Sequence, residues 1–283
     1  MTEFKMEAAI IFDSHIPYAL RRALEYAGED GFVASMPQLL HARANAPYDN
    51  IIWNTWFTSN SEESVVTTAE GTRVVVAVHG GGIYATPERF ERTYRASVNR
   101  SNPEGFTGQY AGKISEIEAR DVLEGKLPCG TEIPVYPYDE FKQGIADLPM
   151  RYGVILDYDL ARKSTQGFQS FDALKDEPNM IVRAGGVESL AAYLDRAQAR
   201  HNTKVMGNFH PFDYINPDQP QTRVLFLAGN NGGVGSEGDY NYGYDSENGI
   251  GGYACMLNMA RYAAVVPQNA STSVRDLPFS PSS

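Results

Sequence analysis

The sequence predicts an α+β fold with a mixed or mostly antiparallel sheet, short helices and many loops. Segments of β-forming composition outnumber segments with helical periodicity, and most of the helical segments are short. The two kinds do not alternate regularly, as a chain of repeated strand–helix–strand units would require. The 283 residues include 26 glycines and 16 prolines, which divide the chain into these short elements.

The N-terminal segment is expected to form a strand followed by a helix. Residues 6–12 are mostly apolar and end at Asp13. Ser14 is a typical N-cap residue, and the apolar residues of 18–28 recur at helical spacing. Gly28 is the expected end of this helix, because glycine readily adopts the left-handed conformation found just after many helices.

The clearest strand of the chain lies within residues 71–82, where four valines precede a histidine and three glycines. Before it, residues 36–44 have the composition of a helix, and Ser35 is suited to cap it. Residues 49–57 are rich in β-forming residues. We therefore expect a helix, a β-rich segment and a strand in this part of the chain.

Capping signals mark two further helices. The Thr-Pro-Glu sequence at 86–88 is a strong helix start and precedes residues 89–97. Ser115 and Glu118 have the spacing of a capping box, in which each side chain bonds the backbone of the other. The helix that they begin is expected to end at Gly125.

The second half of the chain is expected to contain more strands than helices. Its clearest helix covers residues 187–201, with Val187, Leu190, Ala191 and Leu194 on one apolar stripe. The other expected elements are strands over 132–138, 151–159, 179–185, 203–209 and 222–229, and a helical pattern that changes into a strand over 251–266.

A seam between two parts of the chain is expected near Gly144, Pro149 and Gly153, since these residues interrupt regular structure. The length suits one large domain or two modest ones. We therefore expect one large domain, or two tightly packed halves over 1–148 and 149–283.

Composition excludes several classes of partner. The net charge of −11 and pI of about 4.9 disfavour nucleic acid and anionic membranes, which would repel the chain. No stretch reaches the roughly 18 apolar residues of a membrane helix, and the N-terminus lacks the features of a signal peptide. Cys129 and Cys255 are too few for a disulfide framework, so we expect a cytoplasmic protein. Association into a homo-oligomer is compatible with the sequence.

A glycine-rich, acidic segment over residues 229–252 follows one of the expected strands. Gly233–Gly238 has the spacing of a dinucleotide-binding loop, but the residues after it are poor helix formers, and no phosphate-binding G-x-x-x-x-G-K-[ST] sequence occurs. We therefore expect no nucleotide cofactor. Asn230 and Asn231 are candidate ligand-binding residues at the start of the segment.

Alternating oxygen-bearing residues in the same segment suggest a cation site. Asp239 and Asp245 belong to a D-x-N-x-G-x-D-x-E pattern, similar to that of calcium loops. Tyr244 and Ile250 replace the glycine and glutamate of an EF-hand, so that motif is excluded. A solvated loop, an extended strand, a divalent-cation cradle and a wall for a polar ligand all remain open.

The turn at His79-Gly80-Gly81-Gly82 is the second candidate site. The HGGG sequence after a strand resembles the oxyanion loop of lipases and esterases with the α/β-hydrolase fold, but no G-x-S-x-G sequence accompanies it. That family is therefore excluded. The three glycines predict either a nest of backbone N–H groups for an anionic ligand or a tight structural turn.

Histidines at strand ends complete the candidate active site. His79, His210 and Asp213 are the candidate catalytic residues, and His15 joins Asp239 and Asp245 as a candidate metal ligand. These residues favour an enzyme that acts on a small polar molecule, as a general acid/base or metal-assisted hydrolase or lyase. The alternative is a non-catalytic small-ligand-binding or structural protein.

Overall fold

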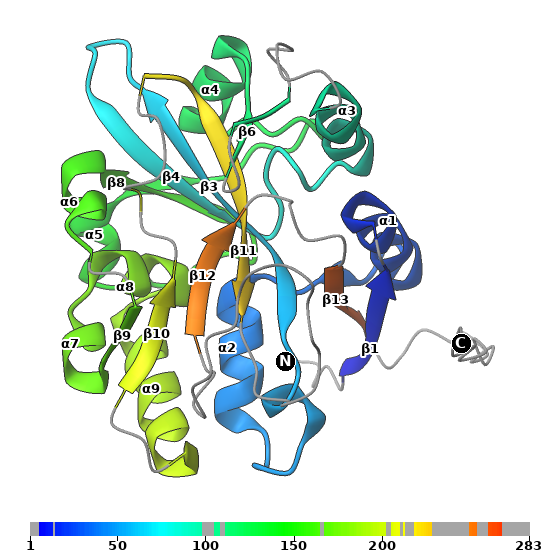
Figure 1. Ribbon diagram of the computed structural model, residues 1–283, viewed down its shortest axis with the longest axis vertical. Coiled ribbons are helices and arrows are strands. Elements are labelled where there is room, and N and C mark those ends of the chain that lie inside the picture. Colours follow the sequence, from blue (N-terminus) through cyan, green and yellow to red (C-terminus); the bar gives the residue numbers. More distant parts are fainter. Residues whose placement is uncertain are drawn as a thin grey trace.

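Two β-sheets organise the chain, and helices cover both faces of the larger one (Figure 1). The computed structural model describes residues 6–13, 15–97, 105–107, 111–164, 167–201, 205–209, 212, 218–227, 249–253 and 260–267.

The larger sheet is mixed and mostly antiparallel, as the sequence predicts. Only the pairs β7–β8 and β10–β12 are parallel among its described pairings. In sheet order its strands are β7 (Val135–Pro137), β8 (Tyr152–Asp157), β4 (Arg73–His79), β3 (Phe57–Thr67), β11 (Gln221–Leu227), β12 (Gly249–Tyr253), β10 (Val205–Phe209) and β9 (Gly167–Ser170), with β6 (Ala111–Lys113) pairing β11 and β5 (Phe106–Thr107) pairing β6.

The smaller sheet brings distant parts of the chain together. β1 (Met6–Asp13) pairs antiparallel with β13 (Ala260–Pro267), which also pairs with β2 (Phe32–Val33). A backbone hydrogen bond connects the smaller sheet to the larger one. In it, the N–H of Asn60 in β3 donates to the carbonyl of Ala34, just after β2.

Local capping signals fix several helices. The Ser115–Glu118 capping box is present, Gly125 follows that helix with φ of +74°, and Gly28 ends the first helix, all as predicted. The helices are α1 (Ile16–Ala27), α2 (Met36–Asn45), the 3-10 helix η1 (Ile51–Trp53), α3 (Pro87–Ser97), α4 (Glu116–Leu123), α5 (Tyr138–Lys142), α6 (Tyr158–Arg162), α7 (Phe171–Lys175), α8 (Pro178–Ala184) and α9 (Val187–His201).

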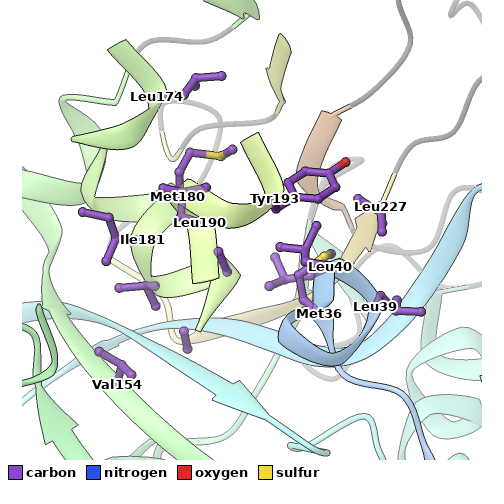
Figure 2. Packing of buried hydrophobic residues seen from close by; sticks show 14 of the residues in the cluster. Met36, Leu39, Leu40, Val154, Leu174, Met180, Ile181, Leu190, Tyr193 and Leu227 are labelled. Atoms are coloured by element: carbon purple, nitrogen blue, oxygen red, sulfur yellow. The ribbon is translucent and has the colours of Figure 1, made fainter. Parts of the chain in front are cut away.

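A hydrophobic core lies on each side of β4, which explains its run of valines. Val75 and Ala77 pack into the core formed with α2, α8 and α9, part of which Figure 2 shows. Val76 and Val78 pack on the opposite side, against α1, α3 and α4. A strand that is buried on both faces has a continuous apolar sequence instead of an alternating one.

Four expectations about individual elements are wrong. Residues 251–253, expected to begin a helical pattern, lie in strand β12. Residues 179–185 form helix α8 and not a strand, because Pro178 begins the helix and Gly185 ends it in the left-handed conformation. Residues 49–57 contain η1, and β3 begins only at Phe57. His15 is the N-cap of α1, while Ser14 lies outside the described residues.

Strand β3 was not predicted, because its sequence is polar. Ser61, Glu62, Glu63 and Ser64 lie in its middle, and all four are buried. A polar run in the centre of a sheet is stable only when every buried group finds a partner. The partners of these side chains define the candidate site.

Candidate functional site

His79 ends β4 and is completely buried. Its Nε2 lies 3.0 Å from the carbonyl oxygen of Val182, and its Nδ1 lies 2.9 Å from the hydroxyl of Ser61. A carbonyl can only accept, so Nε2 carries the proton and Nδ1 accepts from the serine. Burial lowers the pKa of His79 to about 4, although the Val182 carbonyl and Glu63 oppose this. The imidazole is neutral, has both nitrogens occupied and does not reach solvent.

The three glycines after His79 also have internal partners. The N–H groups of Gly80 and Gly81 both donate to the carbonyl oxygen of Asn60, at 3.0 and 2.9 Å. Gly82 leaves room for a neighbouring side chain, since a Cβ there would lie 2.6 Å from the carboxylate of Glu62. These contacts give the turn a structural role.

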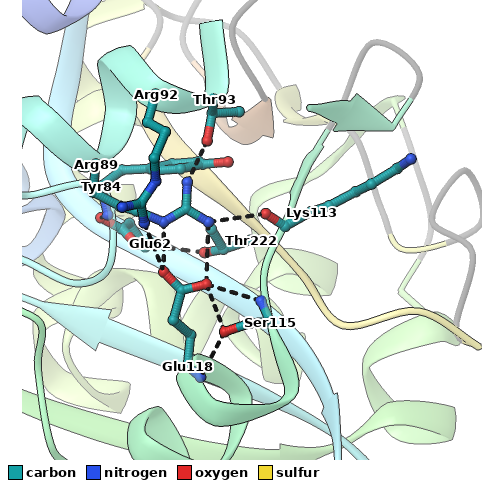
Figure 3. A network of polar contacts seen from close by, with 9 residues as sticks. All are labelled: Glu62, Tyr84, Arg89, Arg92, Thr93, Lys113, Ser115, Glu118 and Thr222. Carbon is teal, nitrogen blue, oxygen red and sulfur yellow. Dashed lines mark hydrogen bonds and ion pairs between the residues drawn. The ribbon is translucent and has the colours of Figure 1, made fainter. Parts of the chain in front are cut away.

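A carboxyl group does occupy the turn, and it belongs to the protein's own Glu62. The N–H of Tyr84 donates to its Oε1 at 2.7 Å, and the N–H groups of Ile83 and Ala85 also donate to this carboxyl. Thr222 of β11 donates a longer bond of 3.4 Å to Oε2, as Figure 3 shows. Burial raises the pKa of Glu62 to about 7 against the effect of these donors. Glu62 therefore occupies the backbone N–H groups of the residues that follow the three glycines.

Glu63 joins three elements through a buried ion cluster. Its carboxylate accepts from Arg183 of α8 at 2.7 and 3.0 Å, and from Arg223 of β11 at 3.0 and 2.8 Å. All three side chains are at most 2% exposed. Burial alone raises the pKa of Glu63, but the two guanidinium groups lower it to about 2. The cluster ties β3 to α8 and β11, and sequence reasoning missed both acidic residues of β3.

The predicted metal ligand His15 contacts another helix. Its Nε2 lies 2.6 Å from a carboxylate oxygen of Glu91 in α3, and its ring meets Tyr94 edge-on. Within the part of the chain that the structure describes, no three histidine, cysteine, aspartate or glutamate side chains gather as a metal site would require. Asp239 and Asp245 lie outside the described residues.

A charged cavity of about 310 Å³ lies between the start of α3 and α4. Arg89 borders it, but its guanidinium donates to both carboxylate oxygens of Glu118, to the hydroxyl of Thr93 and to the carbonyl of Lys113 (Figure 3). Glu118 also caps α4 through Ser115. The lining contains three acidic and three basic side chains, so the cavity has no net charge to select an ionic ligand.

The glycine-rich segment follows β11 and leads into β12, and these two strands pair in the larger sheet. Leu227, the last residue of β11, is in register with Ile250 of β12 and with Phe57 of β3. The described strands on either side of the segment are thus neighbours within the sheet. Residues 229–248 of the segment, including Asn230, Asn231, Asp239 and Asp245, lie outside the described residues, as do His210 and Asp213.

Comparisons with known proteins identify the fold. No family model matches the chain, and a search of curated proteins finds no match. The chain is similar to a solved structure described as accommodation of massive sequence variation in Nanoarchaeota by the C-type lectin fold, with a TM-score of 0.63 and 23% sequence identity. The likeness covers 92% of this chain and 98% of that chain. The chain therefore has a C-type lectin-like α+β fold.

Proposed function

We propose that this protein binds a ligand without transforming it, and that the residues between β11 and β12 supply the contacts. The observation that carries the proposal is the pairing of Leu227 with Ile250, which fixes both ends of the 228–248 segment on neighbouring central strands. Binding loops are most effective when a rigid scaffold holds their ends, because less entropy is then lost on binding.

The composition of the 228–248 segment supports recognition. It contains Tyr240, Tyr242 and Tyr244 among glycines, asparagines, aspartates and serines. Antibody loops use the same set, because tyrosine gives a large, amphipathic contact area at low entropic cost, and the small polar residues adapt their hydrogen bonds. The segment therefore has the chemistry of a binding surface for a folded or polar ligand.

The structural likeness also supports this proposal. The similar solved structure is described as accommodating massive sequence variation on the C-type lectin fold. A fold that tolerates such variation keeps its stability in the scaffold and its specificity in the varied residues. In the present chain, the buried contacts of Glu62 and Glu63 join elements that lie outside the 228–248 segment.

The enzyme hypothesis has less support from the described residues. His79 is buried with both ring nitrogens hydrogen-bonded, and the N–H groups of Gly80 and Gly81 donate to the carbonyl oxygen of Asn60. A catalytic histidine must reach the proton that it transfers. A catalytic role would therefore depend on His210 and Asp213. Alanine at His210 tests it directly: a loss of turnover with an unchanged melting temperature would favour the enzyme.

Replacing Tyr240, Tyr242 and Tyr244 together with alanine tests the binding function. The immobilised full-length chain and this triple variant are used in parallel to capture ligands, and the affinity of each captured ligand is measured for both. We expect at least a roughly tenfold loss of affinity, as for truncated aromatic anchors, with an unchanged melting temperature. Tyr18→Ala, at a tyrosine of α1 that is 55% exposed, is the matched control. Equal affinity in the triple variant would reject the proposal.

A divalent cation at Asp239 and Asp245 remains a separate prediction from the sequence pattern. Calcium would then raise the melting temperature of the wild-type protein by mass action, and the Asp239→Asn/Asp245→Asn variant would lose this effect. The same result in both proteins would reject the cation site.

A further inference from the structure

The side chains of Phe12, Trp56 and Arg261, which come from distant parts of the sequence, form a cluster next to strand β3 of the larger sheet. Arg261 of β13 is in register with Phe12 of β1, and Trp56 directly precedes β3. The Cζ atom of Arg261 lies 5.5 Å from the centre of the Phe12 ring and 4.9 Å from the ring of Trp56. These distances are those of cation–π contacts, which hold a guanidinium group by its face.

Arg261 differs from three of the buried arginines of this protein in having no anionic partner among the described residues. Arg183 and Arg223 share Glu63, and Arg89 binds Glu118. For Arg261, no ion pair or hydrogen bond of the side chain to another described residue is found, and its guanidinium contacts the two aromatic rings. Burial lowers its pKa, and no anion among the described residues compensates.

The cluster is open to solvent. Phe12 is 46% exposed, and both Trp56 and Arg261 are partly exposed. Neither ring can accept the N–H groups of the guanidinium as a carboxylate would, and the side chain is partly exposed. A planar fork of N–H donors matches the two oxygens of a carboxylate.

The surrounding charge restricts the anion that fits. The chain has a net charge of −11, so it repels a polyanion, whereas one carboxylate beside one isolated guanidinium meets little repulsion. Phe12 and Trp56 add apolar surface next to the charged group. The arrangement favours a ligand with a single carboxylate next to an apolar or aromatic portion.

We propose that Arg261, whose guanidinium contacts the rings of Phe12 and Trp56, binds a carboxylate group of the ligand. The site rests on the proposed binding function and extends it by naming one group that the ligand carries. Trp56 lies beside the end of β11, because the next residue, Phe57, is in register with Leu227.

The two tryptophans allow a direct test. Trp53 is completely buried and stacked on Tyr193, whereas Trp56 belongs to the proposed site. The full chain is labelled with 5-fluorotryptophan, and its two fluorine resonances are followed during titration with sodium benzoate. We expect a saturable shift of the Trp56 resonance alone. Benzamide, which has the same ring without the charge, and sodium chloride at equal concentration should give no saturable shift.

Variants of the arginine complete the experiment. Arg261→Gln should weaken benzoate binding by roughly tenfold or more, and Arg261→Lys should weaken it less, since the ammonium group keeps the charge but loses the fork. Arg95→Gln, at an exposed arginine of α3, is the matched control and should bind benzoate normally. An unchanged Trp53 resonance shows that each variant is folded. Phe12→Ala, at an exposed position, replaces Arg261→Gln if that variant does not fold.

Several results would overturn the proposal. These are no saturable shift with benzoate, an equal shift with benzamide, or normal benzoate binding by Arg261→Gln. The absence of a shift is also the result expected if an acidic side chain of the protein already occupies Arg261. The triple tyrosine variant should bind benzoate as the wild type does, so failure of this site and failure of the binding function are distinguished.

Discussion

The backbone N–H of Tyr84 donates a hydrogen bond of 2.7 Å to the carboxylate of Glu62, and this contact fills the turn that the glycines after His79 create. The sequence predicts an anion nest made by the N–H groups of the three glycines, whereas the N–H groups that bind the Glu62 carboxyl belong to Ile83, Tyr84 and Ala85. This carboxyl group comes from the adjacent strand, so the contact joins β3 to the residues just before α3.

The free energy of unfolding should depend on pH, because the pKa of the buried Glu62 carboxyl differs between the folded and unfolded states. Burial raises its pKa from the usual 4.5 to about 7. A raised pKa means that the folded state binds the proton more tightly, so the stabilising contribution is full below about pH 4.5 and is lost as the pH rises through about 7. Glu62→Gln should therefore gain stability relative to wild type across this range, by up to about 3 kcal/mol.

Urea denaturation of both proteins at about pH 5 and about pH 8 measures this difference. Glu188→Gln, at an exposed residue of α9, controls for the loss of one carboxylate. A constant difference between wild type and Glu62→Gln at the two pH values would show that Glu62 is not protonated in the folded state.

His79 should change the free energy of unfolding in the opposite direction to Glu62, over a pH range that overlaps that of Glu62. Its pKa is lowered from 6.5 to about 4, so its stabilising contribution is present above about pH 6.5 and is lost as the pH falls through about 4. His79→Ala leaves the hydroxyl of Ser61 and the carbonyl of Val182 without this buried partner, which should cost about 2 to 4 kcal/mol at neutral pH.

The His79→Ala variant should also lose the acid-dependent fall in stability between about pH 6.5 and about pH 4. Urea denaturation at several pH values tests both points. Full stability in the variant, together with the loss of a measured activity, would restore His79 as a catalytic candidate.

The sequence predicted those parts of the fold that depend on local signals. The capping box of Ser115 and Glu118, the end of α4 at Gly125 and the strand before His79 all involve residues near one another in the chain. Helix α8 was misread because its β-branched residues outweighed its flanking signals, although Pro178 and Gly185 are a typical start and end. Local propensity is thus informative where caps and composition agree.

The buried charges could not be predicted in the same way. Glu63 meets Arg183 and Arg223 across 120 and 160 residues, so nothing local distinguishes it from a solvated acidic residue. The one available signal was the position of two glutamates and their flanking serines immediately before Val65 and the rest of a β-forming run. Such a pattern shows an acidic strand, but only the folded chain shows which cations neutralise it.

Removing the charge of Glu63 should be strongly destabilising. Glu63→Gln leaves the guanidinium groups of Arg183 and Arg223 buried without a carboxylate, which typically costs about 3 to 5 kcal/mol. Arg183→Met in the same background removes one of the unpaired cations. We therefore expect the double variant to be less destabilised than the sum of the two single variants, as measured by urea denaturation. Additive effects, within about 0.5 kcal/mol, would show that the three groups do not act as one cluster.

Gly82 distinguishes a structural turn from a ligand-binding one. A Cβ at this position would lie 2.6 Å from Oε2 and 2.8 Å from Cδ of Glu62, and this carboxyl cannot move away without losing its backbone donors. Gly82→Ala should therefore lower the free energy of unfolding by about 1 to 3 kcal/mol, as overpacking in a buried region does. The control is Gly71→Ala, where a Cβ meets no atom within 4 Å and the only cost comes from the φ of +83°. If Gly82→Ala kept wild-type stability but lost ligand affinity, the glycine turn would be a recognition element after all. If it lost stability and the remaining folded protein bound normally, the turn would serve the scaffold alone.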